Sequence, residues 1–149
     1  MQKTWISILM LLWAFDTHAE SVKVNPYPDL QGKIIKEIKY TDKSGENVIV
    51  LTQTDEIISR TDEYGTQWRS QDIYAYRFLF NQGKMEKMWQ IHDFVHDCMS
   101  DGFGARFFLD LISISDLNKD NLKEVWISYQ TECAGDPGPV PTKIIMYDG

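Results

Sequence analysis

Long hydrophobic runs are nearly absent from this chain of 149 residues. One apolar run of about a dozen residues stands near the N-terminus, which is shorter than the roughly 20 residues that a membrane helix needs. No later segment is more apolar, so we expect no membrane span. Basic residues are also scarce, with 15 Lys and Arg against 22 Asp and Glu and a net charge of −7. This acidic balance argues against nucleic acid or anionic lipid as a partner, and it favours cationic partners or metal ions.

The chain also lacks the sequence patterns of common enzymes. No Gly-x-Ser-x-Gly segment surrounds Ser113 or Ser115, which leaves a hydrolytic triad without support. Carboxylate pairs such as Asp62 and Glu63 could act as acid and base, but chance pairs are expected in a chain this acidic. We therefore expect a binding protein and not an enzyme. Proline is sparse and aromatic residues make up 13% of the chain, which predicts a folded core and excludes general disorder.

The N-terminal apolar run has the layout of a secretory signal peptide. A lysine precedes it, and Thr17 and Ala19 are the small residues expected at positions −3 and −1 of a cleavage site. A buried N-terminal helix is the alternative, but no helical periodicity separates two faces of the run. We predict that residues 1–19 are removed and that the product is periplasmic or secreted. Residues 20–32 then form an extended lead-in, and residues 33–149 form a single β domain.

The rest of the chain has the two-residue alternation of β-strands, interrupted by turns rich in Gly, Asp and Asn. We expect an all-β fold: an antiparallel meander of about eight strands that packs as a sandwich, a half-barrel or a bent sheet. Helix is expected only as a short turn within Asp97–Gly104, which has no strand pattern. No internal repeat is present, so we expect one unit and not an array. The predicted strands are 33–40, 47–53, 56–61, 73–80, 85–95, 107–115, 123–131 and 143–147.

Two cysteines, Cys98 and Cys133, follow the predicted cleavage site. In an exported protein an even number of cysteines predicts a disulfide, whereas two buried thiols would suit a reducing compartment. The bridge would close a loop of about 35 residues and stabilise the fold by about 3–4 kcal/mol in the loop-entropy description. Cys133 also begins a segment rich in Pro and Gly, residues 133–141, which predicts either a recognition loop or a wide turn between two strands.

Oxygen-bearing residues alternate between two of the predicted strands. Asp116, Asn118, Asp120 and Glu124, with the carbonyl of Leu122, would supply the oxygen ligands that calcium prefers. An EF-hand is excluded, because positions 6 and 12 of that motif need Gly and an acid where this chain has Asn and Ile. The segment instead resembles the calcium loops of FG-GAP repeats. A polar turn whose Asp and Asn side chains bond their own backbone is the alternative, and the residues leave both interpretations open.

Two histidines, His92 and His96, stand four residues apart beside acidic residues. On a helix this spacing suits a zinc pair, but here the segment continues a strand, where the imidazoles share a face and lie roughly 13 Å apart. We therefore expect surface or half-buried histidines. Tyr74, Tyr76 and Trp89 on the same predicted hairpin are candidates either to stack on sugar rings or to pack in the core.

The second half of the chain contains four motifs: Asp93-Phe-Val-x-Asp-Cys98, Asp116-Leu-Asn-x-Asp-x-x-x-Glu-Val-Trp126, Tyr129-x-x-x-Cys133-x-x-Asp136 and Lys143-Ile-Ile-Met-Tyr147. With their spacing they resemble a family of small exported proteins, mostly from Bacteroidetes-like bacteria, whose label refers to surface polysaccharide biosynthesis. The resemblance covers residues 73–149. It implies an envelope location, the pairing of Cys98 with Cys133, and a role connected with envelope polysaccharide.

The expected function is that of an exported module of the cell envelope. It would bind an envelope glycan or an envelope protein and would carry calcium in the loop from Asp116 to Glu124. Two other functions remain open. The acidic charge and the Pro-rich segment would suit an inhibitor of a cationic hydrolase such as lysozyme. An enzyme acting on polysaccharide is the third, and it would need a pocket with paired carboxylates.

Overall fold

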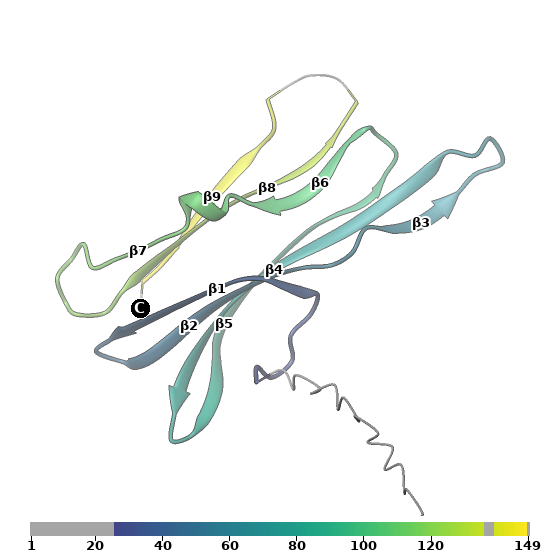
Figure 1. The fold of residues 1–149 in the computed structure, drawn as a ribbon. Helices are drawn as coiled ribbons and strands as arrows, with labels where there is room; N and C mark the ends of the chain where they lie inside the picture. Colours follow the sequence, from purple (N-terminus) through teal and green to yellow (C-terminus); the bar gives the residue numbers. More distant parts are fainter. Residues whose placement is uncertain (1–25, 136–138, 149) are drawn as a thin grey trace, which may run out of the picture.

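The structure is a computed structural model that describes residues 26–135 and 139–148. This part of the chain is almost entirely antiparallel β-strand, which confirms the expected all-β fold (Figure 1). It has nine strands where about eight were expected, and no α-helix occurs among the described residues. The elements are β1 (Lys33–Asp42), β2 (Gly45–Gln53), β3 (Ile57–Thr61), β4 (Gln67–Asn81), β5 (Lys84–Cys98), β6 (Gly102–Phe107), the 3-10 turn η1 (Leu109–Leu111), β7 (Ser113–Ser115), β8 (Glu124–Ala134) and β9 (Thr142–Tyr147).

The first sheet, sheet A, is organised around the 15-residue strand β4. One edge of β4 pairs first with β3 and then with β2, while its other edge pairs with β5 along most of its length. β1 pairs with the free edge of β2. The β4–β5 turn is made by Gln82 and Gly83, both with positive φ, at 49° and 80°. Two such residues suit the tight hairpin that the sequence predicted there.

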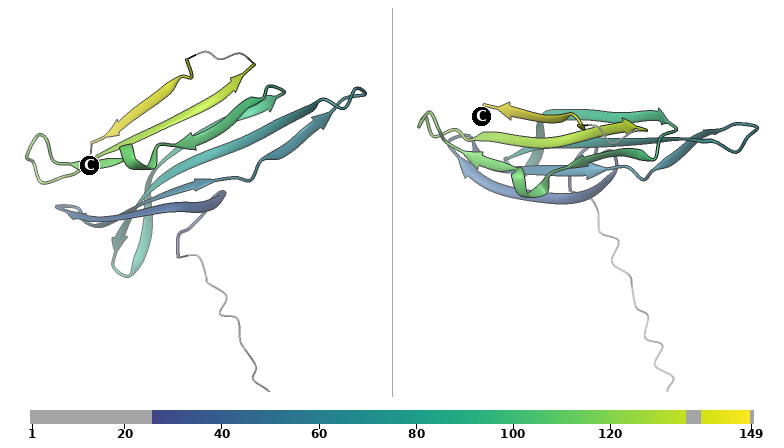
Figure 2. Two further views of the ribbon diagram at one scale, coloured as in Figure 1. Left: turned by 45° about the horizontal axis from the view of Figure 1, so that its top comes forward. Right: turned by 90° about the horizontal axis from the view of Figure 1, so that it is seen from above.

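The second sheet, sheet B, is organised around β8 in the same way. β6 and β7 pair in succession with one edge of β8, and β9 pairs with the other edge. Figure 2 shows the two sheets as adjacent layers. The β3–β4 hairpin projects beyond sheet B in all three ribbon views (Figures 1 and 2).

The main hydrophobic core lies between the two sheets. Alternate residues of sheet A, including Ile49, Leu51 and Ile73, pack against Val125 and Ile127 of sheet B, and all five are almost fully buried. Because each apolar side chain removed from water stabilises the fold by about 1.5–3 kcal/mol, this layer holds the sheets together. Polar residues alternate with apolar ones on β1, which is the pattern of a strand with one buried face.

A second, smaller core covers the other face of sheet A, which we call the outer face. Val48, Val50, Tyr76 and Phe78 are buried there under Tyr27 of the lead-in. Gly32 has φ of 74°, and a Cβ on it would lie 2.8 Å from the carbonyl carbon of Gln53, so only glycine fits this close approach. The lead-in is thus packed on the sheet over residues 26–32; residues 20–25 and the predicted signal peptide lie outside the described residues.

The predicted disulfide is confirmed. Cys98 at the end of β5 is bonded to Cys133 on β8, across 35 residues, with Cα atoms 5.7 Å apart. The bridge therefore ties sheet A to sheet B at one end of the core. Residues 136–138 of the Pro-rich segment that follows Cys133 lie outside the described residues. In the described part of the chain, no helix is long and apolar enough to cross a bilayer.

Two predictions about elements are wrong. The short helix expected within Asp97–Gly104 is absent, because residues from Gly102 onward form β6 and pair with β8. A Cβ on Gly102 would lie 2.5 Å from the carbonyl oxygen of Ala134, so this glycine allows the close pairing. The single strand expected over residues 107–115 is interrupted by η1, where Leu111 N donates to Phe108 O. Pairing with β8 and packing of the apolar residues on the core override the local pattern.

Candidate functional site

The predicted calcium loop joins β7 to β8. The carboxylate of its last candidate ligand, Glu124, accepts hydrogen bonds from other residues of the loop. Glu124 is 4% exposed and is the first residue of β8. Its carboxylate accepts hydrogen bonds from Leu117 N at 2.9 Å, Ser115 Oγ at 2.9 Å and Asn118 N at 3.5 Å. The backbone bond from Leu117 is the main reason that the pKa of Glu124 is lowered. This carboxylate closes the loop by satisfying backbone donors.

The tip of the loop is a pair of turns in which the side chains bond neighbouring backbone groups. Asp120 N donates to Asn118 Oδ1 at 3.0 Å, and Leu122 N donates to Asp120 Oδ1 at 2.8 Å. Asn121 has φ of 69°, in the left-handed region that a glycine would otherwise supply. These are the contacts expected of the polar-turn interpretation.

Asp116 is the ligand candidate whose position fits a cation. Its Oδ1 atom is buried and has no hydrogen-bond partner among the described residues, and its Oδ2 lies 3.8 Å from Lys123 Nζ. A buried carboxylate oxygen without a donor is costly unless a donor or a cation reaches it. In the described residues no three His, Cys, Asp or Glu side chains form a group that could hold a metal ion. The calcium set Asp116, Asn118, Asp120, Leu122 and Glu124 therefore stays a prediction.

The loop is held from outside by the β1–β2 turn. Lys43 N donates to Asn121 O at 2.8 Å, and Lys123 N donates to Asp42 Oδ2 at 3.3 Å. Burial acts to raise the pKa of Asp42, but hydrogen bonds from Ser44 and Lys123, with the charge of Arg77, leave that pKa lowered. This buried polar network orients the loop across the two sheets.

Sequence reasoning missed the network around Arg77. Arg77 is buried on β4, where its Nε donates to Asn47 Oδ1 at 2.9 Å and its guanidinium lies 4.0 Å from Asp42. The signal was present, because an arginine in the apolar stretch Ile73–Phe80 needs buried partners. The role of Arg77 is structural, since it donates to Asn47 and lies beside Asp42 in the β1–β2 turn.

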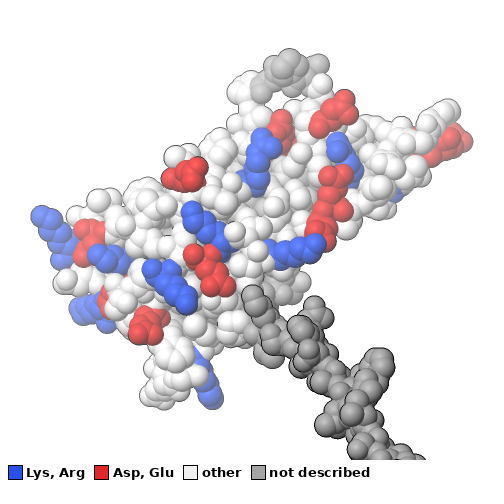
Figure 3. All heavy atoms as spheres, viewed as in Figure 1, with Lys and Arg blue, Asp and Glu red and all other residues white. Residues whose placement is uncertain are grey.

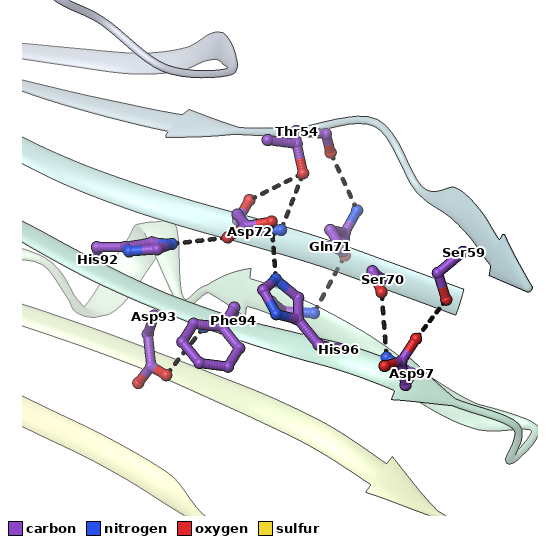
Figure 4. Close-up of polar contacts among 11 residues, drawn as sticks. Thr54, Ser59, Ser70, Gln71, Asp72, His92, Asp93, Phe94, His96 and Asp97 are labelled. Carbon is purple, nitrogen blue, oxygen red and sulfur yellow. Dashed lines mark hydrogen bonds and ion pairs between the residues drawn. The ribbon is translucent and has the colours of Figure 1, made fainter. Parts of the chain in front are cut away.

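A second constellation lies on the outer face of sheet A and contains the two histidines (Figure 4). His92 Nε2 lies 2.6 Å from Asp72 Oδ1, and His96 Nε2 lies 3.3 Å from Asp72 Oδ2. Both imidazoles thus reach one carboxylate, which corrects the expectation that they lie roughly 13 Å apart. The strand spacing applies to their backbones, whereas their side chains lean toward the residue between them on the neighbouring strand.

Asp72 is the residue of this constellation that sequence reasoning missed. It lies on β4 directly opposite Phe94, which stands between the two histidines on β5. Its backbone is fixed by Thr54, whose Oγ1 accepts from Asp72 N at 2.8 Å (Figure 4). The sequence did indicate that Asp72 and Tyr74 share one face, because side chains two residues apart on a strand point to the same side. The register between β4 and β5 was needed to place them beside the histidines.

Aromatic rings flank the carboxylate on this face. Tyr74 stacks on His92 with ring centroids 4.4 Å apart, and Phe94 stacks on His96 at 4.1 Å. Phe94 is 47% exposed, and both histidines are exposed. Burial and then the charge of Asp72 raise the pKa of Tyr74, so its phenol stays protonated and able to donate. We call Tyr74, His92, Phe94 and His96 the aromatic row.

The other two candidates for sugar stacking belong to the interior. Tyr76 is fully buried under the lead-in, where its hydroxyl accepts from Gln31 N at 2.9 Å. Trp89 points to the opposite face of sheet A and stacks on Tyr147 of sheet B at 4.3 Å. Of the three predicted candidates, only Tyr74 lies beside exposed rings.

Comparison of the chain with family models, with curated proteins and with solved structures finds no match. The features of the molecule that bear on its function are the aromatic row, the carboxylate of Asp72 and the loop from Asp116 to Glu124.

Proposed function

We propose that this protein is an exported module of the cell envelope that binds a neutral glycan on the outer face of sheet A. The observation that carries the proposal is the aromatic row with Asp72 at its centre. Exposed rings pack against the C–H faces of sugars, while a carboxylate and imidazole or phenol N–H and O–H groups exchange hydrogen bonds with sugar hydroxyls. All of these groups lie on one face of the adjacent strands β4 and β5. Figure 4 shows Asp72 together with His92, Phe94 and His96.

Binding is favoured over catalysis by the contacts of the two imidazoles. A Ser-His-Asp relay needs a hydroxyl or thiol on the imidazole that the carboxylate orients. In the described part of the chain, neither His92 nor His96 bonds a hydroxyl or thiol, and both contact Asp72. The carboxylate of Asp72 contacts both imidazoles, and no hydroxyl or thiol of the described residues is hydrogen-bonded to either imidazole as a nucleophile would be.

Export is supported by two independent features. The N-terminal residues have the layout of a signal peptide, and the bridge between Cys98 and Cys133 is of the kind that persists in oxidising compartments. The resemblance of residues 73–149 to exported proteins labelled for surface polysaccharide supports a glycan over other envelope ligands. Calcium at Asp116 is part of the proposal, because the buried Oδ1 of Asp116 fits a cation ligand.

An inhibitor of a cationic hydrolase is the second candidate, and the net charge of −7 favours it. Such an inhibitor would present a continuous acidic surface to its target. On the face drawn in Figure 3, Lys and Arg side chains are interleaved with Asp and Glu side chains. This face therefore offers no continuous acidic patch to a cationic target.

The test is affinity electrophoresis of the exported form of the full chain in gels that contain neutral polysaccharides: a glucan, a mannan or a xylan. We expect at least one of them to retard the protein, and Phe94→Ala to abolish the retardation. The matched control is Tyr64→Ala, because Tyr64 is 86% exposed on the β3–β4 turn, away from the aromatic row. Absence of retardation by every neutral polysaccharide, or an equal loss in both variants, would overturn the proposal.

A further inference from the structure

A hollow of about 460 Å³ opens at the end of sheet A that carries the β1–β2 turn. Its lining includes Lys39, Thr41, Glu46 and Val48 from β1 and β2, and Phe80 and Met85 from β4 and β5. The volume is within the range of about 300–1,000 Å³ typical of small-molecule sites. None of these residues belongs to the aromatic row or to the loop from Asp116 to Glu124.

The hollow arises where two hairpins diverge. The register of β4 and β5 shifts between Arg77 and Phe78, and such a bulge bends the strands that contain it. Figure 1 shows the tip of the β4–β5 hairpin pointing away from the tip of the β1–β2 hairpin, and Figure 2 shows the same divergence. The side chains between the two tips therefore surround a depression.

The base of the hollow is apolar. Val48 is buried, Met85 is half-buried, and Phe80 is 44% exposed although it is a large hydrophobic residue. A phenylalanine ring beside a methionine side chain forms an adaptable apolar surface that accommodates ligands of different shapes. An apolar group placed there would lose contact with water on several sides.

The rim of the hollow carries one charge of each sign. Lys39 lies opposite Val48 and Thr41 lies opposite Glu46, so Lys39 and Glu46 are diagonal neighbours on one face of the hairpin. Diagonal neighbours of this kind are about 7–8 Å apart. Neither side chain forms an ion pair or a hydrogen bond with another described residue. Both charges are therefore available to a ligand.

We propose that this hollow binds a free α-amino acid with an apolar side chain. The ligand's ammonium group would lie at Glu46, its carboxylate at Lys39, and its side chain against Phe80 and Met85. A simple anion would meet the repulsion of Glu46, and a simple cation would meet that of Lys39, so only a ligand with both charges satisfies the rim. The separation of the two side chains is short enough for one small zwitterion to reach both.

The proposal is tested by NMR on the full exported chain labelled with ¹³C in the methionine methyl groups. Met85 reports on the hollow, and Met146 on β9 reports on the opposite sheet. The probes are L-phenylalanine, phenylacetate, which lacks the ammonium group, and phenethylamine, which lacks the carboxylate. We expect saturable movement of the Met85 signal, but not the Met146 signal, with L-phenylalanine at millimolar concentration, and at least about fivefold weaker binding of the other two probes.

Charge-removing variants provide the second arm of the test. Lys39→Met and Glu46→Gln are expected to weaken L-phenylalanine binding about fivefold each. Lys84→Met and Glu86→Gln change exposed charges of the same sign on β5 and are expected to leave binding unchanged. An unperturbed Met146 signal shows that each variant is folded.

Three results would overturn the proposal: no movement of the Met85 signal with L-phenylalanine, equal binding of all three probes, or equal weakening by the matched control variants. The aromatic row is not involved in any of these measurements. Failure here would therefore leave the glycan proposal standing, and failure of polysaccharide retardation would not affect this one.

Discussion

His92 and Asp72 lie 20 residues apart in the chain but on adjacent strands, with His92 Nε2 only 2.6 Å from Asp72 Oδ1. The second oxygen of the same carboxylate lies 3.3 Å from His96 Nε2. One acceptor therefore holds two imidazoles, each of which also stacks on an aromatic ring. The carboxylate thus contacts both imidazoles of the aromatic row.

Replacing Asp72 by Asn tests the role of these contacts. The amide retains the size of the side chain but offers one acceptor oxygen where the carboxylate offers two. We expect weaker retardation by the neutral polysaccharide that retards the wild type, with stability lowered by less than about 1 kcal/mol because the contacts are partly exposed. Asp97→Asn is the control, since Asp97 bonds Ser59 and not a histidine. Equal retardation of Asp72→Asn and wild type would contradict the role of Asp72.

Removal of the disulfide should destabilise the fold strongly. The bridge closes a loop of 35 residues, for which the loop-entropy description predicts a loss of about 3–4 kcal/mol. We expect Cys98→Ser and Cys133→Ser to lower the urea midpoint by the same amount, and the double variant to lower it no further. Reduction of the wild type should have the same effect. A single variant as stable as the wild type would show that the bridge does not stabilise the fold.

The core between the sheets predicts that replacing two leucines by alanine will change the free energy of unfolding by different amounts. Leu51 is fully buried between the sheets, whereas Leu117 is 70% exposed in the loop before β8. Leu51→Ala is expected to lower the free energy of unfolding by about 2–5 kcal/mol, because it removes buried methyl groups and leaves a cavity. Leu117→Ala should change it by less than about 0.5 kcal/mol. Urea titrations followed by tryptophan fluorescence measure both, and similar losses would contradict the packing described.

Acid should destabilise the protein through its paired carboxylates. The pKa values of Asp42, Asp93 and Glu124 are lowered in the fold; for Asp93, hydrogen bonding to Lys143 and its charge overcome the opposing effect of burial. A lowered folded pKa contributes stability above the unfolded pKa, and this stability is lost as the pH falls through the folded pKa.

We therefore expect the urea midpoint to be constant near neutral pH and to fall below about pH 4.5, where unfolded carboxylates begin to bind protons. Glu124→Gln should be less stable than the wild type at pH 7 and should lose less stability on acidification. Glu86→Gln, which removes an exposed carboxylate on β5, should retain the acid dependence of the wild type. An identical acid dependence in Glu124→Gln and the wild type would contradict the assignment.

Calcium binding is tested by calorimetry and thermal unfolding of residues 20–149 after chelation. An exported calcium module typically has a Kd of about 10⁻⁴–10⁻³ M, so 10 mM calcium should stabilise the fold by about 1.4 kcal/mol or more. Asp116→Asn should abolish the binding heat and the rise in Tm. Asp110→Asn, which changes an acidic residue of η1, should retain both. No heat and no rise in Tm with the wild type would eliminate calcium from the proposal.

Local pattern was sufficient for most of the fold. The alternation of apolar and polar residues identified most of the strands, including 73–80 and 85–95, which form the predicted hairpin with Gly83 at positive φ in its turn. It was insufficient at Gly102–Phe107, where the residues have little strand pattern and pairing with β8 decides the conformation. It also missed the break at η1, which follows from the packing of the chain onto the core.

The amino-acid sequence by itself predicted the strand class, the hairpin turns and the pairing of the only two cysteines, because these depend on neighbouring residues or on a unique choice of partner. Only the tertiary structure decided which side chains meet. The contact between Asp42 and Lys123 spans 81 residues, and the two histidines converge on Asp72 through the register of β4 and β5. A shift of one residue in that register would turn Asp72 to the opposite face of the sheet. Register depends on the whole packed core, and no local stretch of sequence specifies it.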